Sequence, residues 1–254
     1  MMILKSKKLV LRLILVTFAA VMILLFKAGP VVAQTKKYKI PIFSVNTQEK
    51  LVSLTFNAAW DAADTETILD ILEKHGIKAS FFLCGSWVEK YPEILKKIYA
   101  AGHDIGNHGD THAHVASISL EANKNEITGL HKKVKHIIGI DMELYRGPYG
   151  EYNNTVVTAA ESLGYTMIQW DVDSLDWMNR GEQDIINRVL HNKKLKNGSI
   201  ILFHTDGKYT ASVLEQIING MDGKGYKCVP VSELIYKNDY YIDVEGRQHR
   251  NPVQ

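Results

Sequence analysis

Two histidines four residues apart, His108 and His112, are the clearest candidates for chemistry in this sequence. They lie in the segment NHGDTH, directly after residues 103–107, which we expect to form a short strand. If the loop coils so that both imidazoles lie on one side, they can bind one divalent metal ion. Zinc is the commonest occupant of such a site, with Co, Ni or Mn as alternatives. Ten histidines in one chain also produce this spacing by chance, so solvated loop histidines are the alternative interpretation.

The rest of the chain predicts a scaffold for these histidines. After residue 50, short apolar segments alternate with segments that have the spacing of amphipathic helices. We therefore expect an α/β fold, a distorted or incomplete (β/α) barrel of about seven parallel strands, with an open doubly wound sheet as the alternative. Strands are expected at 51–57, 79–83, 103–107, 144–145, 166–170, 199–203 and 227–229, and helices at 65–75, 88–101, 120–138, 154–163, 184–191 and 211–221.

Polar residues follow the ends of these expected strands. In a (β/α) barrel the loops after the strands share one face, and active sites are built there. We therefore expect side chains from distant parts of the sequence to converge with the two histidines. The residues in such positions are Asn57, Asp64, His108, His112, Arg146, Asp173, Asp176 and His204.

The first 33 residues have the pattern of an export segment. Lys5, Lys7, Lys8 and Arg12 precede an uncharged, mostly apolar run at 13–26, as in a signal peptide. A membrane-spanning helix needs about 20 apolar residues, so a retained anchor would require 9–11 to join the run. Either alternative, a cleaved signal or a retained anchor, places the domain outside the cytoplasmic membrane, extracellular or anchored on the outer side of that membrane.

We expect four regions: this leader at 1–33, a linker at 34–49, one folded domain at 50–238 and a C-terminal tail at 239–254. The leader holds five of the 30 basic residues and no acidic residue, so 25 basic and 28 acidic residues remain, a net charge of −3. This charge does not indicate nucleic-acid binding, and we expect a monomer that contacts membrane only through the leader. Cys84 and Cys228 could pair outside the cell, but we interpret Cys84 as a small buried residue.

Five segments in order, TFNAAWDAADT, NHGDTH, RGPYGEYN, DVDSLDW and ILFH, resemble the polysaccharide deacetylase family (the NodB-homology domain, carbohydrate esterase family 4). The resemblance spans 51 to about 235, and the end of the chain resembles clostridial, sporulation-associated members. It implies a barrel of this kind and a metal-dependent hydrolase that acts on carbon–nitrogen bonds other than peptide bonds. The implied substrates are N-acetylated peptidoglycan or chitin-like chains, with O-acetyl groups as the alternative target.

The resemblance also implies roles for individual residues. His108 and His112 would bind the metal, which activates water, and His204 would protonate the departing amine. The other implied roles belong to Asp176, which orients His204, to Arg146, which pairs with the base, to Tyr149 after Pro148, whose N–H holds the oxyanion, and to Trp177 and Leu202, which line the acetyl pocket.

The first motif departs from the family pattern. Members usually have two adjacent carboxylates, a general base and a metal ligand, where this chain has Asn57 and Ala58. We predict Asp64 as the third metal ligand, with Asp61 as its substitute, although Asp64 is also well placed to cap a helix. An amide cannot accept the proton from a metal-bound water at neutral pH.

Three hypotheses follow from this departure. The first is an exported deacetylase of cell-wall or spore-wall glycan, attenuated because Asn57 replaces the base. The second is a catalytically silent relative that binds glycan or a partner protein in the same groove. The third is a different metal-dependent hydrolase on the same barrel.

Overall fold

The computed structural model describes residues 38–252. These residues fold around one sheet of mainly parallel strands. The strands are β1 Ser44–Val45, β2 Leu51–Ala58, β3 Ser80–Leu83, β4 Asp104–Asn107, β5 Leu144–Tyr145, β6 Thr166–Met167, β7 Val172–Asp173, β8 Ser199–His204, β9 Lys227–Cys228, β10 Tyr240–Ile242 and β11 Arg247–Arg250. The α-helices are α2 Thr65–Lys74, α3 Gly85–Lys90, α4 Pro92–Ala100, α5 Leu120–Ile138, α6 Asn154–Ser162, α7 Glu182–Leu190, α8 Thr210–Gly223 and α9 Val231–Leu234. Three short 3-10 turns are η1 Val115–Ser117, η2 Pro148–Gly150 and η3 Asp176–Met178.

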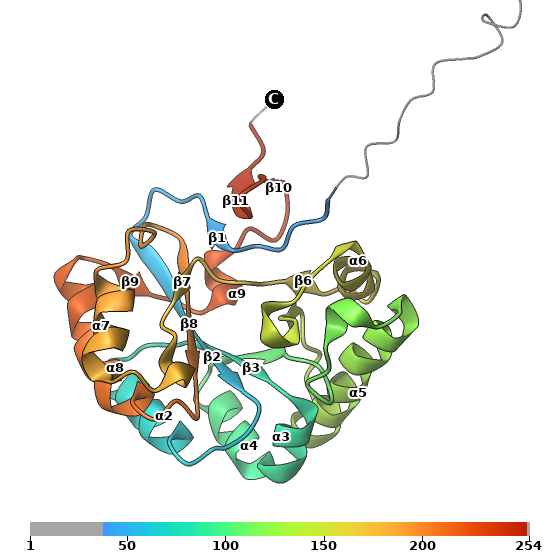
Figure 1. The fold of residues 1–254 in the computed structure, drawn as a ribbon, viewed down its shortest axis with the longest axis horizontal. Coiled ribbons are helices and arrows are strands. Elements are labelled where there is room, and N and C mark those ends of the chain that lie inside the picture. The colour runs from blue at the N-terminus through green and yellow to red at the C-terminus, as the bar shows by residue number, and fades with distance from the viewer. Residues whose placement is uncertain (1–37, 253–254) are drawn as a thin grey trace, which may run out of the picture. The chain divides into compact units, whose positions relative to one another are not determined.

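The sheet has the strand order β10-β11-β1-β8-β2-β3-β4-β5-β6, with β7 paired to β8 and β9 paired to β2. Pairing is parallel from β8 through β6, whereas β1 is antiparallel to β8 and β10 is antiparallel to β11. Figure 1 shows α2 to α8 arranged around the outside of the curled sheet. The predicted α/β fold, a distorted (β/α) barrel, is confirmed.

The segment before β1 joins the two sides of this curled sheet. Ile42 forms a parallel bridge with Ile168, just after β6, and its N–H donates to the carbonyl of Met167 at 3.0 Å. Two residues later, Ser44 pairs with Ser199 of β8. Residues 42–45 therefore link the β6 edge to β8, which a sequence pattern of alternating strands and helices does not predict.

Alternation along the strands assigns side chains to two faces of the sheet. On β8, Ile201 and Phe203 belong to the large core cluster under the helices, while Ile200 packs in a second cluster with Ile42 and Phe82. The same alternation directs Leu202 and His204 toward the second, inner side. The two-residue alternation of side chains along β8 therefore places His204 on the inner side of the barrel at the end of the strand.

The predicted helix at 88–101 is two helices, α3 and α4, because a proline interrupts it. Pro92 cannot donate a backbone hydrogen bond and disfavours helical geometry at the preceding residue. Tyr91 accordingly has φ −128° and ψ 52°, and Pro92 occupies the first turn of α4. The predicted bounds of α5 agree with the structure, with Ser119 accepting from the N–H of Ala122 at its start and Gly139 in the left-handed region (φ 78°) at its end.

The segment predicted as a C-terminal tail contains β10 and β11, and β11 pairs with β1. Gln248 is buried in β11, and its side-chain amide makes two 2.8 Å hydrogen bonds with the backbone of Tyr236. Cys84 and Cys228 are unpaired, and Cys84 is buried as interpreted. The leader predicted at 1–33 lies outside the described residues. Within 38–252, no helix is long and apolar enough to cross a membrane.

Candidate active site

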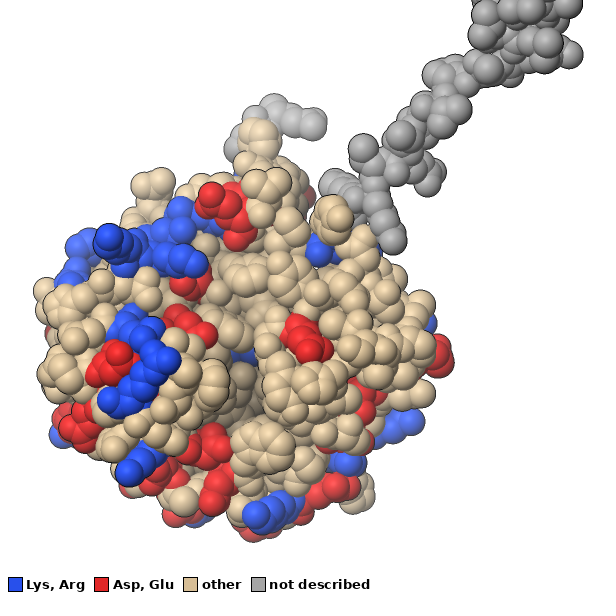
Figure 2. Space-filling view, viewed as in Figure 1, with Lys and Arg blue, Asp and Glu red and all other residues tan. Residues whose placement is uncertain are grey.

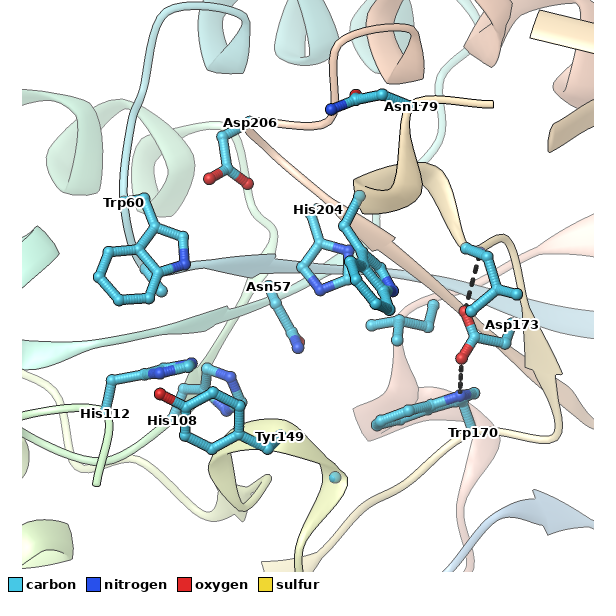
Figure 3. Close-up of a pocket in the computed structure, with 15 residues that line it drawn as sticks. Asn57, Trp60, His108, His112, Tyr149, Trp170, Asp173, Asn179, His204 and Asp206 are labelled. Atoms are coloured by element: carbon cyan, nitrogen blue, oxygen red, sulfur yellow. Dashed lines mark hydrogen bonds between the residues drawn. The ribbon is translucent and has the colours of Figure 1, made fainter. Parts of the chain in front are cut away.

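A pocket of about 600 Å³ opens where the loops after the strands meet (Figure 3). Most of the predicted site residues converge there. The ones that line the pocket are Asn57, His108, His112, Tyr149, Trp177, Leu202 and His204. Arg146, Pro148 and Asp176 do not line the pocket and are buried. Asp64 does not line it either.

Strand register explains this convergence. In the parallel pair of β2 and β8, Asn57 lies opposite His204. In the parallel pair of β4 and β5, Asn107 lies opposite Tyr145, so that His108 and Arg146 follow together at the next position. Parallel strands end at the same edge of a sheet, and residues that end different strands therefore become neighbours.

His204 is held by a completely buried carboxylate, Asp176. His204 Nδ1 lies 2.7 Å from Asp176 Oδ1, and the backbone N–H of His204 donates to Asp176 Oδ2 at 2.7 Å. Thr210 Oγ1 donates to the same oxygen at 2.6 Å, and the N–H of Trp177 donates to Oδ1 at 2.9 Å. Burial would raise the pKa of Asp176, but hydrogen bonds from His204 and Thr210 outweigh it and lower that pKa. Asp176 therefore fixes the His204 ring and leaves its Nε2 for the pocket.

Arg146 is a buried cation. Among the described residues, no carboxylate forms a hydrogen bond or an ion pair with its guanidinium. It donates to Asn57 Oδ1 at 2.9 Å and to the carbonyls of Ile168 and Gln169 at 3.4 and 3.2 Å. Its guanidinium lies 4.0 Å from the ring centre of Phe82. Burial lowers the pKa of Arg146 to about 9, so it remains a cation at neutral pH. Asn57 occupies the position where this charge would favour a carboxylate.

The contact with Arg146 also fixes which end of the Asn57 amide faces the pocket. A guanidinium has only donors, so it must contact the oxygen of the amide. The remaining group, Nδ2, carries only N–H donors and has no basic lone pair. Asn57 can therefore donate a hydrogen bond in the pocket, and it cannot accept a proton there.

His108 and His112 form a neutral imidazole pair. Their ring centres are 5.1 Å apart, and burial lowers the pKa of both, to well below the ordinary value for His108. His108 Nδ1 lies 2.8 Å from the carbonyl oxygen of Arg146, which fixes this nitrogen as the donor. His108 Nε2 therefore keeps a free lone pair, and His112 Nδ1 is buried without a hydrogen-bond partner. Two neutral imidazoles with free ring nitrogens fit a divalent metal ion.

The described residues do not form a ready group of three ligands around this pair. No group of three or more His, Cys, Asp or Glu side chains within 38–252 could hold a metal ion. Asp64 stands at the N-terminus of α2 but makes no capping hydrogen bond, so its predicted role as ligand stays a prediction. Asp61 Oδ1 instead accepts from the N–H groups of Ala62 and Ala63 at 2.6 and 3.2 Å, and the bond from Ala62 lowers its pKa. Asp61 Oδ1 is therefore already used as the acceptor of a local turn.

Unusual backbone conformations concentrate at the pocket. Within 38–252, five residues other than glycine have positive φ, and four of them line the pocket. Such conformations cost roughly 1–3 kcal/mol each and persist where the surrounding structure enforces them. Tyr149 has φ 59°, and its N–H, the predicted oxyanion donor, donates to no other described residue. The four residues are His112, Tyr149, Leu175 and Asn179.

Sequence reasoning missed several residues of the pocket wall. Trp60, Trp170, Asn179 and Asp206 line it, and Trp60 contacts the His112 ring edge-on with ring centres 5.3 Å apart. Trp60 lies inside the quoted TFNAAWDAADT segment, and Asp206 lies two residues after His204. The sequence signal that could have identified them is their closeness to the recognised motifs of the site. A single sequence does not indicate which way a loop side chain points.

Glu126 of α5 holds the loop between the two histidines. One of its oxygens accepts from the N–H groups of Asp110 and Thr111 at 2.9 and 2.8 Å, and the other accepts from Thr111 Oγ1 at 2.7 Å. The loop needs such support because it turns through Gly109 (φ 79°) and His112 (φ 60°) in the left-handed region. Glu126 therefore positions the imidazole pair without lining the pocket.

We expect Glu126→Ala to lower the free energy of unfolding by about 1–2 kcal/mol, because it leaves two backbone donors and one hydroxyl without their acceptor. We also expect Zn²⁺ affinity to fall about tenfold, since the loop no longer orients the imidazoles. Urea unfolding and calorimetric Zn²⁺ titration measure the two effects. Glu49→Ala, at an exposed position away from the pocket, is the matched control. Unchanged stability and Zn²⁺ affinity in Glu126→Ala would refute the positioning role.

Comparison with known proteins places this geometry in a family. Residues 44–168 match the polysaccharide deacetylase family model. YlxY of Bacillus subtilis, an uncharacterized protein, is 32% identical over 77% of this chain, and the chain spans only 60% of that protein's length. A peptidoglycan-N-acetylglucosamine deacetylase of Bacillus cereus is 33% identical over 77% of this chain and 93% of its own length.

Similar solved structures include a carbohydrate esterase family 4 pseudoenzyme. A mutant of that protein with restored enzymatic activity has a TM-score of 0.73 to this chain at 30% identity, and the match covers 76% of this chain and 70% of the other. The wild-type pseudoenzyme comes from Bacillus anthracis. Both the sequence matches and the fold lead to one assignment: the chain belongs to the polysaccharide deacetylase family, carbohydrate esterase family 4.

Proposed function

We propose that this chain binds N-acetylated glycan of the cell wall or spore wall, peptidoglycan or a chitin-like chain, and removes acetyl groups at an attenuated rate. The observation that carries the proposal is the His204–Asp176 pair, in which a completely buried carboxylate behind the pocket wall holds the histidine that lines the pocket. Burying such a carboxylate is costly unless its hydrogen bonds are satisfied. A site used only for packing would not require it.

Each residue then has a chemical task. In its imidazolium form His204 donates the Nε2 proton to the departing sugar amine and keeps the Nδ1 proton, which Asp176 accepts in a hydrogen bond that orients the ring. The N–H of Tyr149, held in position after Pro148, stabilises the oxyanion, while Trp177 and Leu202 contact the acetyl group. A divalent metal, with zinc as the first candidate, would be held by His108 and His112 and would activate water and polarise the acetyl carbonyl.

Attenuation follows from Asn57. Its pocket-facing group is an N–H donor, because Arg146 contacts the oxygen. A general base typically contributes about 10²–10⁴ in rate, and no described carboxylate occupies its place. Asn57 can still hydrogen-bond to the substrate, so the loss affects turnover more than binding.

A silent glycan-binding pseudoenzyme is the second candidate. Two observations favour it, the amide at position 57 and the lack of a three-ligand group in the described part of the chain. The likeness to a family 4 pseudoenzyme whose mutant has restored activity also supports it. In this case the pocket would bind the same glycan and leave it unchanged.

The proposal includes export. The basic, then apolar, N-terminal segment would carry the domain to the outer side of the cytoplasmic membrane, where its proposed substrate lies. We propose a monomer that touches the membrane only through this segment.

Acetate release by the full chain tests the proposal. Oligomers of N-acetylglucosamine and purified peptidoglycan are incubated with the chain, with added Zn²⁺ or Co²⁺ and with chelator. We expect slow, chelator-sensitive release together with measurable glycan binding. Binding without acetate release would support the pseudoenzyme, and absence of both would refute a glycan site.

A further inference from the structure

Asp206 is a pocket carboxylate that the proposed chemistry does not use. It follows β8 by two residues and lines the pocket together with His204 and Trp60. In Figure 3 its carboxyl group points into the space between these two side chains. Burial raises its pKa, and the nearby His204 partly offsets this effect. Because burial has removed part of the hydration of this carboxylate, a hydrogen-bond donor on a ligand could replace the missing water.

The two acidic residues of the pocket wall differ in how many hydrogen bonds their carboxylates accept from the protein. Asp173 accepts from Trp170 Nε1 at 3.0 Å and from the N–H of Leu175 at 2.8 Å, so it serves the wall itself. Asp206 has its own backbone N–H beside the carboxylate, which lowers its pKa, and no other described residue donates a hydrogen bond to its side chain. A half-buried carboxylate with this little support has capacity for a donor from outside the protein.

The charge of the pocket favours a cationic donor. Its wall contains Asp173 and Asp206 and no lysine or arginine. The three histidines of the wall include the neutral pair His108 and His112, and Arg146 lies buried behind Asn57. In Figure 2 the face is hollowed near its centre, and Asp and Glu side chains lie around the hollow.

The expected position of the sugar amine also favours Asp206 as its partner, provided that the proposed function holds. A sugar nitrogen that receives its proton from His204 must lie within hydrogen-bond distance of that ring, and Asp206 flanks the same ring. We propose that Asp206 pairs its carboxylate with the ammonium group of a glucosamine unit, the product of deacetylation, so that the site binds deacetylated glycan more tightly than the N-acetylated glycan on which it acts. The exposed rings of Trp60 and Trp177 provide apolar surfaces for the sugar faces.

Comparative binding of two tetrasaccharides by the full chain tests this selectivity. One consists of glucosamine and the other of N-acetylglucosamine, and calorimetry is done in mildly acidic buffer, where the amino sugar carries its proton. We expect the glucosamine oligomer to bind about tenfold more tightly, as for a charged hydrogen bond. Asp206→Asn should remove this preference and leave the affinity for the N-acetylated oligomer unchanged, which also shows that the variant is folded. Asp70→Asn, on the exposed surface of α2, makes the same change in net charge and should keep the preference.

Each alternative outcome has one meaning. Equal affinity of the wild-type chain for both oligomers would overturn the selectivity and leave the proposed glycan site intact. A preference that survives Asp206→Asn, or is lost equally in Asp70→Asn, would also overturn the role of Asp206. Failure of the wild-type chain to bind either oligomer would refute the glycan site and the selectivity together.

Discussion

Asn57→Asp is expected to raise the rate of acetate release by about 10²–10⁴, the usual contribution of a general base. Arg146 already points at this position with a 2.9 Å hydrogen bond to the amide oxygen. In the variant one carboxylate oxygen keeps that bond, and the other faces the pocket as a proton acceptor. Acetate release from N-acetylglucosamine oligomers with added Zn²⁺ measures the gain.

The same substitution should also stabilise the fold, by roughly 1 kcal/mol, because a buried guanidinium gains a charged partner at hydrogen-bond distance. Thermal unfolding measures this effect. The control is the double variant Asn57→Asp with His204→Ala, in which the proton donor is absent and the gain in rate should disappear. If Asn57→Asp binds glycan but releases no more acetate than the wild-type chain, the missing base is not what limits the site.

Asp176→Ala is expected to lower the free energy of unfolding by about 3–5 kcal/mol, the range for breaking a buried charged network. The residue is completely buried, and its loss leaves four donors from His204, Trp177 and Thr210 without their acceptor. For a chain of this size the fall corresponds to roughly 6–20 °C in melting temperature. Thr210→Val, which removes one of the four donors, is the matched control and should cost about 1 kcal/mol.

The effect of Asp176→Ala should depend on pH in one direction. Because its hydrogen bonds lower the pKa of Asp176 in the folded chain, the carboxylate contributes stability above its unfolded pKa of about 4. That contribution is lost as the pH falls through the lower, folded pKa. The stability difference between wild type and variant should therefore shrink in acid, and a constant difference from neutral pH down to strong acid would contradict the assignment.

The barrel could be predicted because each unit carries its own local pattern. β8 has apolar residues on both faces, β2 alternates Val52, Leu54 and Phe56 with smaller or polar residues, and α5 has Ser119 and Gly139 at its ends. The link through Ile42 could not be predicted, since its partner Ile168 is distant in sequence and the bridge involves a single residue. The pairing of β11 with β1 could not be predicted either, because it joins the two ends of the domain over only two residue pairs.

The site was predictable where a motif fixes both residue type and backbone position. His204 and Asp176 meet as expected because strand ends adjoin, and Arg146 contacts Asn57 as the motif order implies. Asp64 was harder, because a carboxylate at a helix start fits capping and ligation equally well in sequence. Asp206 was missed because only the surrounding structure shows that its carboxylate faces the pocket.

The link made by residues 42–45 has a consequence for the order of folding. These residues are among the first of the domain to be synthesised, yet their partners are Ile168, Ser199 and Gln248. Pairs so far apart in sequence form slowly, because a long loop must close before any contact rewards it. We expect the barrel wall to remain open until the last strand has emerged from the ribosome. The pocket is then among the last parts of the molecule to take shape.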